Sequence, residues 1–282
     1  MKLTKSLSVG IIGGTGKTGA QFVKIFKSLG FRVRTTGETT KAKNAELIQS
    51  CDVILFAVPL SRAADIIRTE LASSLRTDQL LLDVSSLKTE EVQALLQGKG
   101  EVIGMHPLFG PSTDAKNETI ILCPARATKE TVSSLQKLFK RLKIKTILMT
   151  PEEHDKLMAV VQVIPHLKSL LMAEVLKSLD VNLQSILKTC TPTYELEFNV
   201  IGRFLDDHPD LYMPIIFRNP GTPQILRTLR DSIDQALKTA EAKDLPAAEK
   251  RYLECKKFFE PHLRRARNHS EACIRTLISL SK

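Results

Sequence analysis

The chain has 282 residues, of which 43% are hydrophobic and 26% are charged. These proportions lie near the average of globular proteins and exclude a largely disordered chain. The formal net charge is +10, a sign that suits nucleic acid, an anionic membrane surface or a small anionic substrate. The basic residues are, however, interleaved with acidic ones almost throughout, and the length is sufficient for two domains.

Neither nucleic acid nor a membrane is an expected partner. The densest basic cluster, formed by Arg264, Arg265 and Arg267, is interpreted as a solvated helix face. Trp is absent and aromatic residues make up 5% of the chain, so few side chains can stack on a single strand. No apolar run approaches the ~18 residues that a membrane helix needs. The first residues also lack the long apolar core and the cleavage site of a signal peptide.

The cysteines indicate the compartment. Their number is odd, and no CxxC pair or zinc-ligand spacing occurs. A disulfide framework is therefore not expected, and we predict a metal-free protein of the reducing cytoplasm. The five positions are Cys51, Cys123, Cys190, Cys255 and Cys273.

The first half of the chain, to about residue 149, alternates short strands with helical stretches. Residues 7–12 are an apolar run, and residues 19–29 carry apolar side chains at helical spacing. Residues 52–58 are almost continuously apolar and end at Pro59, as expected of a strand buried on both faces. This alternation is typical of a parallel, doubly wound sheet. Further strands are predicted over residues 31–35, 80–84, 101–104, 119–122 and 145–148.

The second half is helical in pattern. Pro151, followed by two acidic residues, is typical of the first turn of a helix. Strand-like runs are absent after it. We therefore predict an α/β dinucleotide-binding domain over residues 1–150 and an all-helical substrate and dimerisation domain over residues 151–282. Helices are predicted over residues 157–179, 184–187, 194–205, 225–241, 247–259 and 262–280.

The first functional motif is Gly14-Thr15-Gly16-Lys17-Thr18-Gly19, which follows an apolar strand and precedes an amphipathic helix. In that context a GxGxxG string is typical of a dinucleotide loop, because its glycines permit a tight turn and let a pyrophosphate approach the helix. A P-loop would need a further glycine five residues before Gly16, where Ile11 stands. The predicted nucleotide site also includes Thr36, Val58 and Pro59.

The choice between NAD and NADP stays open. An acidic residue that binds the adenosine ribose usually follows the glycines by ~20 residues. Here Gly37 occupies about that position and Glu38 comes one residue later. Thr36, Thr39 and Lys41 are instead suited to a 2′-phosphate, which favours NADP slightly.

Two further motifs follow predicted strands. His106 lies between a short strand and the loop Pro107–Pro111, at the edge where open α/β sheets place ligands. An imidazole there can take a proton from a hydroxyl while hydride leaves the same substrate. Ser86 and Lys88 follow another apolar strand at the same edge. The alternatives are a structural histidine, a helix N-cap and a solvated lysine.

These motifs, in this order, resemble the prephenate/arogenate dehydrogenase family of tyrosine biosynthesis. The helical half adds Glu153-His154-Asp155, Gln162–His166 and Thr193–Arg203, which look like the family's dimerisation domain. The resemblance covers about residues 7–270 and is closest to the enterobacterial-type enzymes. No chorismate mutase segment precedes the first strand of this sequence, so the resemblance implies a monofunctional version.

The resemblance implies oxidative decarboxylation of prephenate to 4-hydroxyphenylpyruvate with NAD(P), by a homodimer and without a metal. His106 matches the catalytic histidine, and Ser86 matches the serine that assists it. Arg203 matches an arginine that binds a substrate carboxylate. Lys88 and His166 match residues near the substrate.

Alternatives remain for the substrate and for the function. Glu195 stands where some relatives have a second arginine, so arogenate or an amino-prephenate analogue is an alternative substrate. A nucleotide-sensing regulator without turnover and a basic nucleic-acid-binding protein are alternatives of other classes. Among the residues, His154 also suits a first helical turn and His166 a packed core. Arg203 also suits a surface ion pair with Glu195 or Asp206.

Overall fold

The structure is a computed structural model that describes residues 1–38, 40, 43–71 and 76–280. Thr39 and Lys41, predicted above to contact a 2′-phosphate, lie outside the described residues. The chain divides into two compact units. The α/β unit comprises Met1–Gln162 and Asp210–Pro220, and the helical unit comprises Val163–Pro209 and Gly221–Lys282. These packing units begin and end at other residues than the predicted domains.

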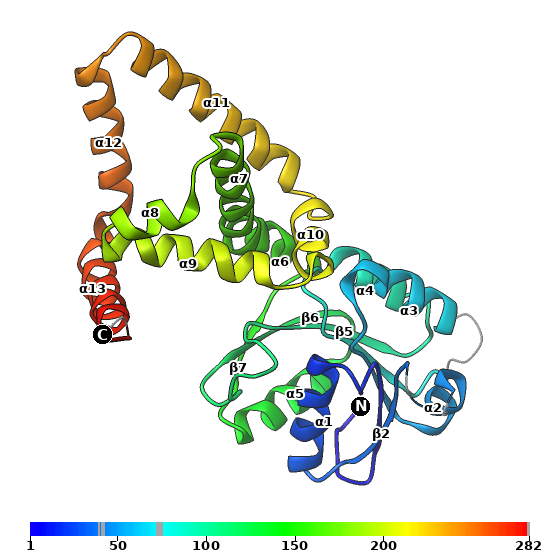
Figure 1. The fold of residues 1–282 in the computed structure, drawn as a ribbon. Helices are drawn as coiled ribbons and strands as arrows, with labels where there is room; N and C mark the ends of the chain where they lie inside the picture. Colours follow the sequence, from blue (N-terminus) through cyan, green and yellow to red (C-terminus); the bar gives the residue numbers. More distant parts are fainter. Residues whose placement is uncertain (39, 41–42, 72–75, 281–282) are drawn as a thin grey trace. The chain divides into compact units, whose positions relative to one another are not determined.

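The α/β unit is built on one seven-stranded sheet with the order β2-β1-β3-β4-β5-β6-β7 (Figure 1). The doubly wound fold class is confirmed, and each of the seven predicted strands is present. The chain places β2 and β3 on opposite sides of β1, so the carboxyl ends of β1 and β3 form the point where ligands bind in such sheets. The strands are β1 Ser8–Ile12, β2 Arg32–Thr36, β3 Val53–Phe56, β4 Leu80–Asp83, β5 Glu101–Pro107, β6 Thr119–Arg126 and β7 Lys145–Leu148.

One strand pair departs from the predicted parallel sheet, since β5 and β6 are antiparallel. Residues 108–118 connect them without a helix, and a parallel pair would need a crossover of about a dozen residues or more, usually helical. The pairing also lengthens β5 to Pro107. His106 therefore lies inside a strand, opposite Ile121, and not after the strand end as predicted.

Helices cover both faces of the sheet. On one face, Phe22 and Phe26 of α1 and Phe139 of α5 pack on the apolar side chains of β1, β3 and β4. On the other, Ile48 of α2 and Ile67 of α3 pack on the alternate side chains of the same strands. Burial on both faces explains the continuous apolar runs in the sequence. These helices are α1 Lys17–Ser28, α2 Asn44–Ser50, α3 Ala63–Leu71, α4 Thr89–Leu95 and α5 Lys129–Arg141.

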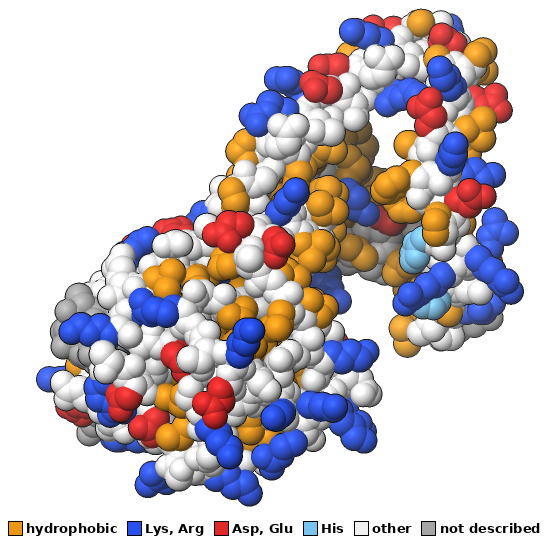
Figure 2. Space-filling model, turned by 180° about the vertical axis from the view of Figure 1, so that it is seen from behind, with side chains coloured by type: hydrophobic (Ala, Val, Ile, Leu, Met, Phe, Trp, Pro, Cys, Tyr) orange, Lys and Arg blue, Asp and Glu red, His pale blue; other side chains and the backbone are white. Residues whose placement is uncertain are grey.

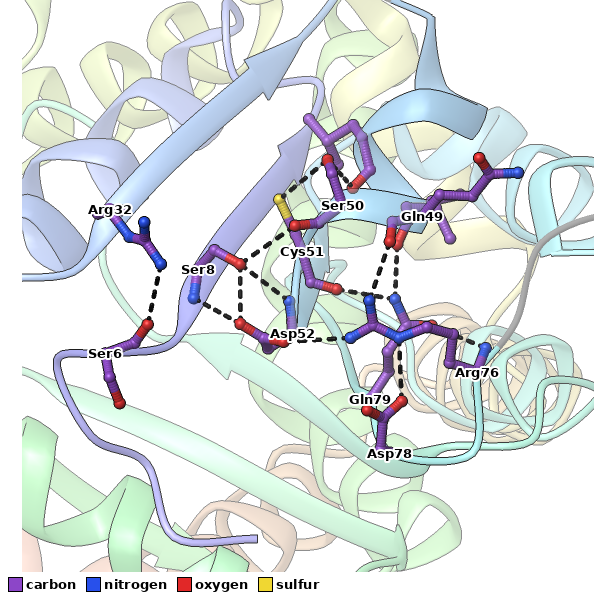
Figure 3. A network of polar contacts seen from close by, with 12 residues as sticks. Ser6, Ser8, Arg32, Gln49, Ser50, Cys51, Asp52, Arg76, Asp78 and Gln79 are labelled. Atoms are coloured by element: carbon purple, nitrogen blue, oxygen red, sulfur yellow. Dashed lines mark hydrogen bonds and ion pairs between the residues drawn. The ribbon is translucent and has the colours of Figure 1, made fainter.

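A polar network closes the amino-terminal edge of the sheet, opposite the ligand edge (Figure 3). Ser8 donates two hydrogen bonds of 2.8 Å to the carboxylate of Asp52, which also pairs with Arg76 at 3.1 Å. Gln79 is fully buried, and its amide donates to the carbonyls of Ile48 at 2.6 Å and Cys51 at 2.8 Å. The network thus fastens the end of α2 to the starts of β3 and β4.

The helical unit consists largely of amphipathic helices, and Figure 2 shows many apolar side chains exposed on it. Ile233 is 60% exposed and Phe258 is 79% exposed. Helix α10, Pro209–Phe217, packs with the α/β unit and was not predicted, because Pro214 interrupts a segment without a polar face. Helix α6, Pro151–Met158, also belongs to the α/β unit. The helices of the helical unit are α7 Ile164–Ser178, α8 Leu183–Thr189, α9 Pro192–Asp206, α11 Thr222–Glu241, α12 Leu245–Phe259 and α13 Leu263–Leu280.

One helical stretch, Pro151–Ser178, is long and apolar enough to cross a membrane by length and composition alone. This differs from the expectation that no segment reaches that length. The evidence for a span is weak, because the core helix of a water-soluble protein passes the same test. The first turns of this stretch also hold buried His154 and Asp155.

The network of Figure 3 generates a stability prediction. Gln79→Leu keeps the volume of the side chain but leaves the carbonyls of Ile48 and Cys51 buried without donors. An unsatisfied buried polar group costs about 1–3 kcal/mol. We therefore expect a clear loss of unfolding free energy, measured by urea denaturation. The control is Asp78→Asn, which removes the ion pair between Asp78 and Arg76. This ion pair contributes little to stability because the Asp78 side chain is 70% exposed. Equal stability of the two variants would contradict the prediction.

Candidate active site

The glycine loop between β1 and α1 approaches the end of β3 closely. Gly13 has a φ of +81°, and a Cβ there would lie 2.2 Å from the carbonyl oxygen of Ala57. A Cβ at Gly19 would lie 2.1 Å from the carbonyl oxygen of Gly13. At Gly16, by contrast, the nearest atom to a Cβ would be 3.4 Å away. The loop is therefore packed on its inner side and open at Gly16, where the amino end of α1 can receive a pyrophosphate.

The end of β2 lies beside this loop. A Cβ at Gly37 would lie 2.0 Å from Oγ1 of Thr15, so a ribose-binding acidic side chain at position 37 would require the Thr15 side chain to move. Thr36 is buried, and its hydroxyl has no hydrogen-bond partner among the described residues. Val58 is half-buried, with its Cγ1 3.3 Å from where a Cβ at Gly13 would lie, and Pro59 next to it is exposed. The predicted loop thus fits a dinucleotide, and the choice between NAD and NADP stays open.

A buried ion pair lies after β4, at the same edge of the sheet. Lys88 is fully buried, and its ammonium donates to the carboxylate of Asp83 and to the hydroxyl of Ser85. Ser85 also donates to Asp83. The lysine is therefore not solvated, and its predicted place near the substrate stays a prediction. Ser86, predicted to assist catalysis, is half-buried next to this cluster.

Glu91 of α4 adds a buried carboxyl to this region. Burial raises the pKa of Glu91 to about 7, although Lys88 and Arg218 lower it. The Arg218 guanidinium lies 3.5 Å from the Glu91 carboxyl and also pairs with Glu90. A carboxyl with such a pKa is partly protonated at neutral pH.

A chain of hydrogen bonds joins two histidines and an aspartate. Nδ1 of His106 lies 2.8 Å from Nε2 of His154, and Nδ1 of His154 lies 2.8 Å from Oδ1 of Asp155. His106 and His154 are 3% and 0% exposed. On the far side of His106, the amide nitrogen of Gln162 lies 3.5 Å from Nε2. Gln162 belongs to a π-helical segment, Ala159–Val163, a local widening that is frequent at functional sites.

Burial determines the charges of His106 and His154. The pKa of His106 lies well below its usual value because of burial, with the charges of His154 and Lys88 acting in the same direction. Burial also lowers the pKa of His154, against the hydrogen bond to Asp155. Burial by itself raises the pKa of Asp155, but hydrogen bonds from His154 and from the backbone of Lys88 and Thr89 outweigh it and lower the pKa. Both histidines are therefore neutral at pH 7, and Asp155 is charged.

Sequence reasoning assigned no role to Asp155 or Gln162, and a first helical turn was an open alternative for His154. The sequence signal that could have indicated a role for Asp155 was its place next to His154 in a motif that matches the family. Residues 210–220 were missed entirely. The side-chain amide of Asn219 donates to the carbonyl of Asp155 at 2.9 Å, and Ile215 packs with Leu60 and Leu87.

The remaining predicted residues belong to the helical unit. His166 stacks on Phe204, with ring centroids 5.8 Å apart and an interplanar angle of 22°. Arg203 is exposed on α9 and lines a groove of about 710 Å³ formed by α7, α8 and α9. Neither arrangement tests a contact with substrate, so the roles of Arg203 and His166 stay predictions.

The glycine loop and a buried neutral histidine at the same sheet edge define a dinucleotide-dependent oxidoreductase. Comparison with protein families is more specific. Residues 31–148 match the nucleotide-binding domain of prephenate dehydrogenase, and residues 150–252 match its dimerization domain. The chain belongs to the prephenate dehydrogenase family, as the motifs indicated.

Individual relatives agree with this family. The chain is 30% identical to a probable arogenate/prephenate dehydrogenase of Methanocaldococcus jannaschii, with 97% of this chain and 66% of the relative aligned. It is 24% identical to the T-protein of Enterobacter agglomerans, with 94% and 71% aligned. The chain thus spans about two thirds of the length of these curated relatives.

Solved structures show the same fold. Prephenate dehydrogenase from A. aeolicus, crystallised with hydroxyphenyl propionate and NAD+, superposes with a TM-score of 0.71 at 18% identity, covering 92% of this chain and 99% of that one. Synechocystis arogenate dehydrogenase superposes with a TM-score of 0.66 at 19% identity, covering 90% and 99%.

Because Gly16 is open, we predict that nucleotide affinity falls as the side chain at position 16 becomes larger. Gly16→Ala adds a methyl group that has room in the loop, whereas Gly16→Val fills the space over the helix terminus. We expect Gly16→Val to lower nucleotide affinity by at least tenfold, and Gly16→Ala by less, in titration calorimetry with NAD and NADP. Thermal melting should show that both variants fold. Unchanged affinity in a folded Gly16→Val protein would show that the nucleotide binds elsewhere.

Proposed function

We propose that the protein catalyses the NAD(P)-dependent oxidative decarboxylation of prephenate to 4-hydroxyphenylpyruvate in tyrosine biosynthesis. The observation that carries the proposal is the buried, neutral His106 at the sheet edge that also holds the glycine loop. The family models and the relatives named prephenate or arogenate dehydrogenase support the substrate class. The hydroxyphenyl propionate bound by the A. aeolicus structure is a ring compound of related shape.

The proposed chemistry uses the residues as follows. The bound nicotinamide supplies the acceptor for a hydride from C4 of the substrate ring. Nε2 of His106 takes the proton of the C4 hydroxyl. With the hydride and the proton gone, C4 carries a carbonyl oxygen. The bond between the ring and its carboxylate breaks, carbon dioxide leaves, the bonding electrons complete the aromatic ring, and the C4 oxygen takes the proton back from His106 to form the phenol. Ser86 assists at the hydroxyl, and Lys88 acts from inside the domain by holding Asp83 and Ser85 in place.

The substrate carries two carboxylates in the proposed reaction, and we assign one of them to Arg203, with His166 nearby. A guanidinium can bind a carboxylate through two parallel charge-assisted bonds. Glu195, in the same helix α9, stands where some relatives carry a second arginine. This acidic residue favours a substrate with an amine near that position, which makes arogenate or an amino-prephenate analogue the second candidate.

The assembly and the location are part of the proposal. We propose a homodimer formed through the helical unit, because this unit exposes large apolar side chains and matches a dimerization domain. All five cysteines are free, which suits the reducing cytoplasm that we propose as the location.

One assay separates these candidates. NAD(P)H absorbance is followed with prephenate and with arogenate in turn, each with NAD and with NADP. Turnover of prephenate supports the proposal, and a preference for arogenate selects the second candidate. Nucleotide binding without turnover of either substrate contradicts both and leaves a nucleotide-sensing regulator.

His106→Asn tests the proton acceptor. Asparagine retains a donor near the position of Nδ1, so the contact with His154 can persist, but it has no basic nitrogen at the position of Nε2. Loss of a general base costs about 10²–10⁴-fold in rate, and we expect kcat to fall in that range with nucleotide affinity unchanged. His269→Asn, on the exposed face of α13, is the matched control. If His106→Asn retains a third of the wild-type kcat, another group takes the proton.

Arg203→Ala tests the carboxylate anchor. Hydrogen bonds to charged groups contribute about 1.5–3 kcal/mol, so the KM for the substrate should rise roughly 10–100-fold. The effect on kcat should be smaller than that of His106→Asn. Arg203→Lys should recover only part of the loss, because an ammonium lacks the planar fork. Arg230→Ala, an exposed arginine of α11, is the control. An unchanged KM for both prephenate and arogenate would assign Arg203 to the surface.

A further inference from the structure

We infer that His154 and Asp155 are positioning residues that fix His106 in the tautomer whose Nε2 accepts the substrate proton. The inference rests on the proposed function for its catalytic meaning. Its geometry lies entirely within the α/β unit, in the chain of hydrogen bonds from Asp155 through His154 to His106.

The first step concerns Asp155, which can only accept hydrogen bonds when it is charged. Its Oδ1 accepts from the backbone N–H of Lys88 at 2.9 Å, and its Oδ2 accepts from the N–H of Thr89 at 2.8 Å. Three donors thus converge on this carboxylate when the His154 ring is counted. The proton between His154 and Asp155 must therefore be on Nδ1 of His154.

The second step passes this choice to His106. A neutral His154 with its proton on Nδ1 has only a lone pair at Nε2. Because Nε2 of His154 lies 2.8 Å from Nδ1 of His106, the second proton must be on Nδ1 of His106. This leaves Nε2 of His106 unprotonated, which is the state that a general base requires.

The third step concerns the surroundings of that nitrogen. The amide nitrogen of Gln162 lies 3.5 Å from it, a distance that allows only a weak bond, and the amide oxygen of Gln162 is buried without a partner among the described residues. A hydroxyl placed here can donate to His106 while Gln162 makes a second hydrogen bond to it. When His106 takes the proton, its Nδ1–H still points at His154, and the charge of Asp155 stabilises the resulting cation through His154.

The pair is held by three elements of the unit. Helix α6 begins with a capping box between Thr150 and Glu153, which fixes its first turn. The carboxylate of Asp155 binds the amino end of α4, and Asn219 binds the carbonyl of the same residue. The other charges in electrostatic contact with the histidines, Lys88 and Asp83, neutralise each other as an ion pair. The carboxylate of Asp155 is therefore the charge that decides the tautomers.

The tautomers can be measured without any activity. We propose ¹⁵N–¹H correlation spectra of the full chain with labelled histidine at pH 7, with His106→Asn and His154→Gln used to assign the two rings. The expected result is a protonated Nδ1 and an unprotonated Nε2 for both His106 and His154. A His106 ring with its proton on Nε2 overturns the inference, whatever the enzyme turns over.

Two variants at position 154 provide the catalytic test. His154→Gln retains an acceptor near the position of Nε2, whereas His154→Phe retains a ring and removes the acceptor. We expect His154→Phe to lower kcat by ~10²–10³-fold with little change in the substrate KM or in nucleotide affinity. His154→Gln should recover more than half of that loss on a logarithmic scale and keep the His106 tautomer.

The controls separate the possible failures. Nucleotide affinity and thermal melting show whether His154→Phe folds, and His269→Phe is the matched control on an exposed helix face. A folded His154→Phe protein with wild-type kcat overturns the inference. If His154→Phe does not fold, the spectra of the wild type and of His154→Gln decide. If the wild type turns over neither prephenate nor arogenate, the proposed function fails while the spectra still test the tautomers.

Discussion

The active site depends on one carboxylate in a place where water cannot reach it. Asp155 follows directly from the first turn of α6, is 2% exposed, and accepts hydrogen bonds from the amino end of α4 and from His154. A charge so buried is stable only when donors surround it. Those same donors fix α4, α6 and the His154 ring relative to one another, so one interaction organises the ends of two helices and the proposed base, His106, in β5.

Burial also explains how His106 can act as the base in the proposed reaction. Desolvation disfavours the imidazolium, so His106 stays neutral at neutral pH and has a lone pair to offer. The cost is that the proton, once accepted, leaves a cation in a poorly solvated place. The chain through His154 to Asp155 supplies the compensating negative charge at a distance, without Asp155 contacting the reacting atoms. Burial likewise raises the pKa of Glu91 to about 7. At neutral pH this carboxyl is therefore partly protonated and adds less than a full negative charge near the site.

Much of the fold followed from local sequence pattern. The strands were predictable because their runs, such as residues 52–58, are apolar on both faces, a pattern typical of strands in a sheet covered by two layers of helices. The glycine loop was predictable because a Cβ at Gly14 or Gly19 would clash with neighbouring atoms, whereas Gly16 leaves the space over the helix terminus open. Helix α10 was not, since Pro214 and an apolar surface all round conceal the helical period. The antiparallel β6 was not either, because periodicity carries no strand direction.

The sequence by itself determined the family, the nucleotide loop and the catalytic candidate His106, because these depend on short motifs whose spacing is set by one turn or one strand end. Only the tertiary structure decided which neighbours His106 has. His154 lies 48 positions further along the chain, and no local pattern records that its ring faces β5. The same holds for Lys88, which the sequence placed at the ligand and the fold buried against Asp83. Contacts between residues distant in the chain arise from packing, and packing is decided by the whole unit at once.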